Sequence, residues 1–236
     1  MKFAALILTC QKLQYVQRRT QQLETIKNLK ELGADIFYLY GDTTSESSYI
    51  KDESLYVPVA EDYEYIPLRI FKGFEYLRSQ EYQGILKMDD DIQITNKEAF
   101  ARALVGILHN PYAAVKSVGG REILNKQDII VVNTYPWKKC KESILNSTYA
   151  MYPSVEYASG PIYWIGIDLL KRLQESDYSK CIFEDVCSGI AAKKYGISLS
   201  HTHILFNQAI KGDDSPWPYR QYTMRNEDLY RHFIYS

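Results

Sequence analysis

Apolar residues occur along the chain in two alternating patterns. Residues 3–9 form a continuous apolar run, which is typical of a strand buried on both faces. A helix is predicted over 20–32, because apolar residues recur there at helical spacing and Gly33 follows as a stop. A second strand is predicted over 34–40. A strand, a helix and a strand joined by short links predict an α/β sheet.

The same two patterns continue to about residue 203. Further helices are predicted over 64–79, from a capping box that begins at Thr95, over 167–175 and over 183–195. Further strands are predicted over 55–59, 85–94, 112–118, 129–132, 157–166 and 197–203. Residues 43–54 and 133–150 are polar and are predicted as loops. No repeat, linker or low-complexity segment divides the chain, so we expect one domain over residues 1–236.

Composition and charge exclude some classes of protein. The chain has 236 residues, of which 46% are hydrophobic and 24% charged, and its formal net charge is -1. This balance is typical of a globular domain and gives no basic surface for nucleic acid or an anionic membrane. The four cysteines, at positions 10, 140, 181 and 187, lack the paired spacing of a zinc site or a disulfide framework. The apolar N-terminal run is too short to span a bilayer, so no membrane-spanning segment is expected.

Asp89, Asp90 and Asp91 form the strongest chemical signal in the sequence. They interrupt the apolar, strand-forming stretch 85–94, and burying three like charges is costly unless a partner compensates them. A divalent cation with a polyanionic ligand behind it is the usual partner. The alternative is a solvated turn between two strands, where aspartate is also common.

Three further segments carry weaker signals. The small residues in 157–160 allow a ligand to approach the backbone, although a simple tight turn has the same composition. Glu184 and Asp185 open a predicted helix, where acidic residues are ordinary capping and dipole chemistry. His201 and His203 lie on one face of a predicted strand, an arrangement that is usually accidental without other ligands.

In their order along the chain, these segments resemble the motifs of the GT-A glycosyltransferases, and most closely those of the β-1,3-galactosyltransferase and Fringe-like group (glycosyltransferase family 31). The matching segments are Lys87–Ile92 (KMDDDI), Tyr157–Gly160 (YASG), Glu184–Gly189 (EDVCSG) and Lys194–Ile197 (KYGI). The resemblance covers roughly residues 1–207 and implies an α/β GT-A fold, in which a single Rossmann-like mixed sheet is flanked by helices. It assigns residues 1–95 to a nucleotide-sugar-binding half, 96–211 to an acceptor and catalytic half, and 212–236 to a C-terminal extension.

The resemblance implies a metal-dependent inverting glycosyltransferase. Such an enzyme moves a sugar from a nucleotide-diphosphate donor, expected to be a UDP-sugar, to a hydroxyl of a glycan acceptor. Mn²⁺ or Mg²⁺ would bridge the donor phosphates and stabilise the leaving group. Asp91 would be the main metal ligand, and Asp89 would bind the metal or donor hydroxyls. His203 is the first candidate for a metal-binding histidine and His201 the second; if Asn207 occupies the aligned position instead, water is the ligand.

The resemblance also implies donor-binding residues, which are Thr9, Arg18, Asp90, Ser159 and Gly160. Thr9 would border the uridine, since ligands of such sheets lie beyond the carboxyl ends of the strands. Arg18, or Arg19 in its place, would add a positive contact. Asp90 would shape the site next to the metal ligands.

The implied catalytic residues are Asp185 and Glu184. Asp185 would act as the general base that deprotonates the acceptor hydroxyl, with Glu184 beside it. The N-terminus of a helix is expected to keep Asp185 ionised, as a base requires. Tyr163, Trp164 and Trp217 are the candidates for a ring face that contacts a sugar.

The chain also departs from the group that it resembles. Pro161 stands where a further glycine is often seen, and the cysteine framework, stem and membrane anchor of the group are missing. These departures predict a soluble, cytoplasmic protein of a microbe or a virus. Two alternatives stay open at this point: a module that binds nucleotide sugars or glycans without catalysis, and a metal-dependent phosphodiesterase built on the aspartate cluster.

Overall fold

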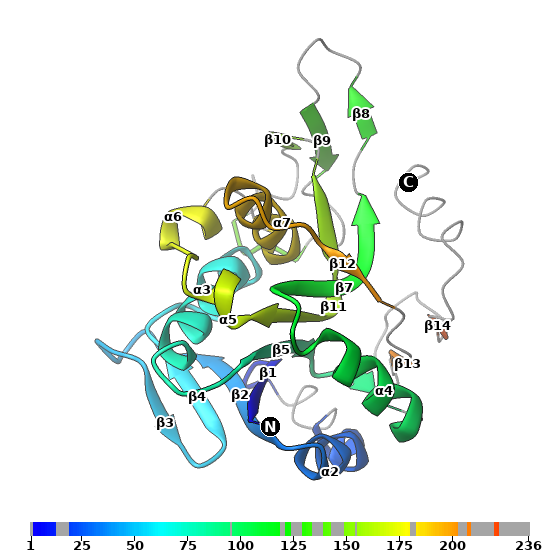
Figure 1. Cartoon of the computed structure of the whole chain (residues 1–236). Helices are drawn as coiled ribbons and strands as arrows, with labels where there is room; N and C mark the ends of the chain where they lie inside the picture. The colour runs from blue at the N-terminus through cyan, green and yellow to red at the C-terminus, as the bar shows by residue number, and fades with distance from the viewer. Residues whose placement is uncertain are drawn as a thin grey trace.

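The computed structural model describes residues 2–12, 19–94, 96–118, 121–123, 129–133, 139–142, 149–153, 155–179, 183–202, 207–208 and 220–221. Within these residues the chain folds around one mixed sheet with helices on both faces (Figure 1). The predicted α/β class with a single principal sheet is therefore confirmed. Two small sheets of three strands each accompany the main one.

The main sheet has eight strands in the order β12-β7-β11-β5-β1-β2-β4-β3. Its strands are β1 (Phe3–Leu8), β2 (Ala34–Gly41), β3 (Tyr49–Lys51), β4 (Ser54–Val57), β5 (Gly84–Asp89), β7 (Tyr112–Val118), β11 (Glu156–Gly166) and β12 (Ser200–His201). Strands β3 and β11 run against the others, which are parallel to one another. The small sheets comprise β8 (Arg121–Ile123), β9 (Ile129–Asn133) and β10 (Tyr149–Pro153), and β6 (Ile92–Gln93), β13 (Asn207–Gln208) and β14 (Arg220–Gln221).

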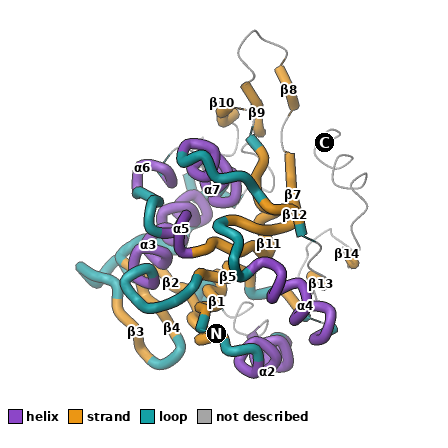
Figure 2. The backbone as a smooth tube through the Cα atoms, viewed as in Figure 1, coloured by secondary structure: helices purple, strands orange, loops and turns teal. Residues whose placement is uncertain are grey.

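The helices form two layers, one on each face of the sheet (Figure 2). They are α2 (Leu23–Glu31), α3 (Ile66–Leu77), α4 (Lys97–Ile107), α5 (Ile167–Leu170), α6 (Glu175–Tyr178) and α7 (Glu184–Lys194), with a 3₁₀ turn η1 (Tyr63–Tyr65) before α3. Helices α2 and α4 cover one face, and α3, α5, α6 and α7 cover the other. None of the helices in the described part of the chain is long and apolar enough to cross a membrane.

Strand β1 shows why its apolar run is unbroken. Ala4 and Leu6 face the core under α3, whereas Phe3, Ala5 and Ile7 face the core under α2 and α4, and all five are fully buried. Each large apolar side chain buried in this way contributes about 1.5–3 kcal/mol relative to exposure. The central strand is thus fixed from both sides, and its carboxyl end has a fixed position.

Several predicted element boundaries are wrong. Helix α4 begins at Lys97 and is capped by Asn96, whose Oδ1 accepts the Ala99 N–H at 2.9 Å, so the predicted capping box at Thr95 is one residue early; Thr95 itself lies outside the described residues. The amide oxygen of Asn96 satisfies a free N–H of the first turn, as serine or threonine would. Strand β3 forms inside a segment that was predicted as a loop.

Two predicted elements are also shorter than expected. The helix expected over 167–175 divides into α5 and α6, because Gln174 and Asp177 form a capping box that starts a new helix. The strand expected over 197–203 is limited to β12 within the described residues, and residues 197–199 have no regular structure.

Helix α7 packs closely on β11 because the facing residue of the helix is a glycine. A Cβ atom on Gly189 would lie 2.5 Å from the Tyr157 Cβ and 2.8 Å from the Glu156 carbonyl oxygen. Both distances are shorter than a van der Waals contact, so any larger residue forces the helix away from the strand. The last glycine of the EDVCSG segment therefore seats the helix on the YASG strand.

We expect Gly189→Ala to lower the free energy of unfolding by about 1–3 kcal/mol, because overpacking displaces α7 from β11. The control is Gly106→Ala in α4, where an added Cβ has no neighbour within 4 Å. That change should be neutral or stabilise the protein by up to about 1 kcal/mol through helix propensity. Urea denaturation measures both values. Equal stability of the two variants would contradict the close packing at Gly189.

Candidate active site

The candidate site lies where the central strands of the sheet end. Strand β1 has β2 on one side and β5 on the other, all parallel, so the chain order reverses at β1. Ligands of α/β sheets bind beyond the strand ends at such a switch point. The register of β1 and β5 places Leu8 opposite Asp89. One residue further along each chain, the Thr9 hydroxyl donates a hydrogen bond to Asp90 Oδ2 at 2.7 Å.

The turn that carries the aspartate triplet is held from the start of α2. Gln22 is buried, and its side-chain amide donates to the carbonyl oxygens of Asp89 at 3.1 Å and Ile92 at 3.0 Å. The Thr25 hydroxyl accepts the N–H of Ile94 at 2.9 Å. These bonds satisfy backbone groups that the turn leaves unpaired, so the triplet has a defined shape. Sequence reasoning missed Gln22 and Thr25, although both are polar residues on the apolar face of the helix.

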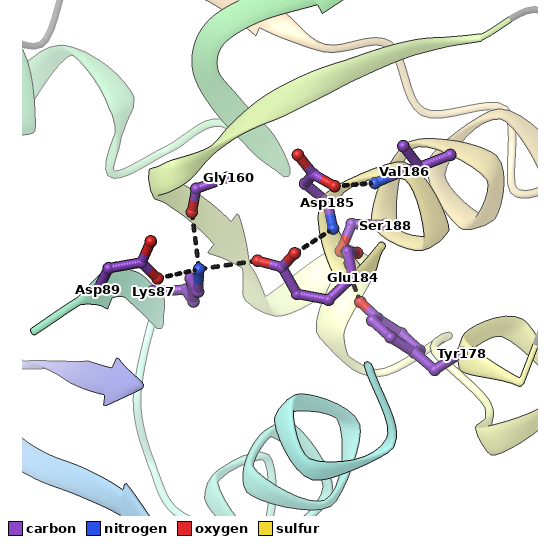
Figure 3. A network of polar contacts seen from close by, with 8 residues as sticks. All are labelled: Lys87, Asp89, Gly160, Tyr178, Glu184, Asp185, Val186 and Ser188. Atoms are coloured by element: carbon purple, nitrogen blue, oxygen red, sulfur yellow. Dashed lines mark hydrogen bonds and ion pairs between the residues drawn. The ribbon is translucent and has the colours of Figure 1, made fainter. Parts of the chain in front are cut away.

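A buried lysine joins the three motif segments (Figure 3). The Lys87 side chain is 2% exposed, and its Nζ lies 2.7 Å from Asp89 Oδ1, from Glu184 Oε1 and from the Gly160 carbonyl oxygen. These partners belong to β5, α7 and β11, respectively. Lys87 is the first residue of the KMDDDI segment, but the sequence alone predicted no role for it. A lysine within the buried run Ile85–Met88 is itself a signal, because lysine is almost never fully buried without partners.

The two carboxylates keep Lys87 charged. Burial alone lowers the pKa of a lysine, since it disfavours the ammonium form. Here the nearby charges of Asp89 and Glu184, and the hydrogen bonds to them, outweigh burial and raise the pKa of Lys87 above its ordinary value. The site therefore contains a fixed positive charge between two fixed negative ones.

Glu184 and Asp185 have different environments at the start of α7. Glu184 uses both carboxylate oxygens: Oε1 binds Lys87, and Oε2 accepts the N–H of Asp185 at 2.6 Å. Asp185 Oδ1 accepts the N–H of Val186 at 2.8 Å, and its Oδ2 lies 3.1 Å from the point that a Cβ on Gly160 would occupy. The glycine of the YASG segment thus leaves room for the Asp185 carboxylate.

Gly160 lies in an irregular part of β11. Ala158 pairs with Lys116 and Tyr163 with Ala114, so five steps along β11 correspond to two along β7, and the residues between them bulge. A bulge changes the direction of backbone groups, and here the Gly160 carbonyl accepts from Lys87. The Tyr112 hydroxyl accepts the Ala158 N–H at 2.9 Å beside the bulge.

Asp185 is not kept ionised by the helix, contrary to the expectation from sequence. Burial and the neighbouring Glu184 charge raise the pKa of Asp185 to about 8, and they outweigh the Val186 N–H and the Lys87 charge, which lower it. The dipole of a helix end is worth at most about 2 kcal/mol, so the desolvation of a partly buried carboxyl and a like charge beside it outweigh the dipole. A general base with a pKa near the working pH is well suited to proton transfer.

Tyr63 in η1 is a further residue that sequence reasoning missed. Burial and the negative charges of Asp185, Glu184 and Asp89 raise the pKa of its hydroxyl, so the phenol keeps its proton. Its ring faces Lys139, whose Nζ lies 5.7 Å from the ring centroid. Tyr63 therefore places a neutral hydroxyl near the three carboxylates.

The aspartates offer part of a metal site. The Asp89 side chain is 31% exposed and binds Lys87 through Oδ1, whereas Asp90 and Asp91 are buried. Carboxylate oxygens suit Mn²⁺ or Mg²⁺, and both ions accept phosphate oxygens in the remaining positions. No group of three histidine, cysteine or acidic side chains in the described residues is arranged to hold a metal on its own. The carboxylate oxygens at the end of β5 are donors of the kind that Mn²⁺ and Mg²⁺ take.

The described candidates for a third metal ligand, His201 and Asn207, lie in different sheets. His203 lies outside the described residues. His201 is in β12 opposite Ala114, on the edge strand and three strands away from β5. Asn207 pairs with Gln93 in β6, directly after the aspartate triplet. Of the two described candidates, Asn207 is therefore the one whose backbone lies beside the aspartate triplet.

Other candidate residues are only partly placed in the site. Arg18 and Trp217 lie outside the described residues, while Ser159 is half-buried in the bulge of β11. Arg19 hydrogen-bonds the Tyr40 hydroxyl near the end of β2. The interpretation of Tyr163 and Trp164 as sugar-stacking rings is wrong. Both are fully buried, because alternate residues of β11 face the two cores.

The sheet order and the acidic strand ends at its switch point define a GT-A fold, the fold of nucleotide-diphospho-sugar transferases. The family model for galactosyltransferases matches residues 37–203. The chain therefore belongs to the galactosyltransferase family and is a glycosyltransferase. No curated protein sequence matches it.

Solved structures show more distant likenesses. One is a 4-diphosphocytidyl-2C-methyl-D-erythritol synthase from Anaerococcus prevotii, with 11% identity, a TM-score of 0.46, and coverage of 86% of this chain and 87% of that chain. Another is a mutant Drosophila β-1,4-galactosyltransferase 7 in complex with manganese, UDP-Gal and xylobiose, with 12% identity, a TM-score of 0.41, and coverage of 100% and 76%. A third is a glucose-1-phosphate thymidylyltransferase from Bacillus anthracis, with 10% identity, a TM-score of 0.42, and coverage of 88% and 89%.

The raised pKa of Asp185 predicts the pH dependence of any step that needs its carboxylate. A carboxyl group with a raised pKa holds its proton at a pH where an ordinary aspartate is ionised. Activity that needs the carboxylate is therefore lost as the pH falls through the raised value of about 8. We expect kcat/KM, measured between pH 5 and 9, to fall about tenfold per pH unit below that limb. If kcat/KM instead began to fall only near pH 4, in protein that stays folded, the raised pKa of Asp185 would be contradicted.

Proposed function

We propose that the protein is a metal-dependent inverting glycosyltransferase. It transfers a sugar from a nucleotide-diphosphate donor, a UDP-sugar, to a hydroxyl group of a glycan acceptor. Within the galactosyltransferase family we place it in the β-1,3-galactosyltransferase and Fringe-like group, on the strength of the KMDDDI, YASG and EDVCSG segments. Their side chains meet at one end of the sheet, which supports a single site for donor and acceptor.

The observation that carries this proposal is the position of the Asp185 carboxylate. It lies against Gly160, and only the Glu184 side chain links it to the Lys87–Asp89 pair at the end of β5. In the proposed complex, the acceptor hydroxyl binds at this carboxylate and the donor binds beyond the end of β5. The separation of the two groups supports a direct displacement at the sugar carbon, in which the attacking and leaving groups lie on opposite faces.

Asp185 is the proposed general base. Its carboxylate takes the proton of the acceptor hydroxyl while that oxygen forms a bond to the anomeric carbon of the donor. The bond from the anomeric carbon to the diphosphate breaks, and the electron pair leaves with the nucleoside diphosphate, so the configuration inverts. Glu184 is a poor candidate for this role, because both of its oxygens are already bound within the protein.

Asp91 and Asp89 are the proposed protein ligands of Mn²⁺ or Mg²⁺, with His203 as the candidate third ligand. Bound there, the ion would offset the negative charge that develops on the departing diphosphate. Thr9, Asp90, Arg18, Ser159 and Gly160 are the proposed donor-side residues. The Thr9–Asp90 hydrogen bond supports a shaping role for Asp90, because that carboxylate is buried and directed toward β1.

The proposal is tested by release of nucleoside diphosphate from a panel of UDP-sugars, with Mn²⁺ and a mixture of glycan acceptors. We expect Asp185→Asn to lower acceptor-dependent release by about 10²–10⁴-fold, the usual contribution of a positioned base. UDP binding in the presence of Mn²⁺ should persist in this variant. The control is Asp168→Asn, since Asp168 is an exposed acid in α5, away from the candidate site.

Each part of the proposal has its own contrary result. Undiminished transfer by Asp185→Asn would remove Asp185 as the base. Transfer that is unaffected by chelation of divalent ions would remove the metal. Binding of donor without release, across the whole panel of acceptors, would favour a binding module instead.

A further inference from the structure

Lys87 is unusual because it is enclosed by the protein while it lies at the edge of the candidate site. Its residue surface is 1% exposed, and its ammonium group has three partners at the same distance of 2.7 Å. An ammonium group has three N–H donors and no acceptor. Two of its donors form hydrogen bonds with Asp89 Oδ1 and the Gly160 carbonyl oxygen, and the ammonium group also forms an ion pair with Glu184 Oε1, so its charge is compensated inside the protein.

The partners of Lys87 come from both sides of the proposed reaction. Asp89 is on the strand that ends at the proposed donor and metal site, and Glu184 begins the helix that carries the proposed base. Gly160 supplies the third partner through its carbonyl group, and it is also the residue against which Asp185 lies. One buried cation thus fixes the spacing between the donor side and the base side.

The path from Lys87 to Asp185 is short. Lys87 binds Glu184 Oε1, and the other oxygen of the same carboxylate accepts the backbone N–H of Asp185. A carboxylate can accept both bonds at once, so it transmits the position of Lys87 to the first turn of α7. The far side of that turn is held separately, because Ser188 Oγ donates to the Glu184 carbonyl oxygen at 2.9 Å and contacts the Tyr178 hydroxyl at 2.8 Å.

We propose that Lys87 is a positioning residue that sets the location of the base Asp185 through Glu184, with Asp89 and the Gly160 carbonyl as its anchor. This role rests on the function proposed above and adds a residue to it. Lys87 does not contact donor or acceptor. It determines whether the Asp185 carboxylate stands where the acceptor hydroxyl must be.

The test compares Lys87→Met with wild type in the same transfer assay. We expect kcat to fall by about 100-fold, the order of loss that a displacement of roughly 1 Å at a catalytic group causes. The Kd for UDP with Mn²⁺, measured by calorimetry, should change by less than about threefold, because Lys87 is enclosed by the protein and its charge is already compensated by Asp89 and Glu184. An equal loss of affinity and of kcat would overturn the proposal and make Lys87 a donor ligand. A kcat within about threefold of wild type would overturn it as well.

A matched control separates positioning from loosening of the helix. Lys194 pairs with the buried Asp177 at 2.7 Å and holds the other end of α7. Lys194→Met should lower the melting temperature while kcat, measured well below that temperature, stays within about twofold of wild type. A loss of kcat as large as that of Lys87→Met would show that any weakening of α7 has this effect, which would overturn the specific role of Lys87.

A second variant keeps the test decisive if Lys87→Met does not fold. Lys87→Met/Glu184→Gln removes the cation together with one carboxylate, so it leaves less uncompensated buried charge. If Lys87 acts through Glu184, the double variant should have a kcat within about threefold of Glu184→Gln alone. A further loss of tenfold or more would overturn the proposed path. If wild type releases no nucleoside diphosphate with any donor, the proposed function fails first, and this proposal fails with it.

Discussion

The structure of the candidate site depends on one buried positive charge. Removing an ammonium group from water costs several kcal/mol, and the cost is offset only when carboxylates with good geometry replace the water. Lys87 meets this requirement with Asp89, Glu184 and the Gly160 carbonyl, each at 2.7 Å. The three partners belong to segments separated by about seventy and twenty-five residues. Those segments must fold against one another for the lysine to be tolerated.

The glycines of the site complete this constraint. Gly189 allows α7 to lie on β11, and Gly160 allows the Asp185 carboxylate to lie against the bulge of the same strand. These two contacts position the first turn of α7 on β11, while the Lys87–Glu184 ion pair sets the distance of that turn from β5. Burial among these groups, with Glu184 as a like charge alongside, is also what raises the pKa of Asp185.

The sequence was sufficient to predict most strands of the main sheet and the segments that form the site. Continuous apolar runs identify strands buried on both faces, and Asp89, Gly160, Glu184 and Asp185 lie together at one end of the sheet. The pattern did not predict which polar atoms meet. The roles of Lys87, Gln22 and Tyr63 depend on contacts between residues far apart in the chain, and local patterns do not contain them.

The pKa of Asp185 could not be predicted from the local sequence either. A helix start favours a negative charge, which is true of an exposed carboxylate. The outcome for Asp185 depends instead on burial and on Glu184, which only the folded structure reveals. The prediction that Tyr163 or Trp164 contacts a sugar was wrong for a similar reason, since the sequence pattern does not show that both faces of β11 are covered.

A crystal structure with Mn²⁺ and UDP, with the metal located by its anomalous signal, is the direct test of this site. We expect manganese at the Asp89–Asp91 turn, with Lys87 still bound to Glu184 and Asp185 still lying against Gly160. Manganese at another place, or Lys87 turned away from Glu184 toward the diphosphate, would contradict this expectation.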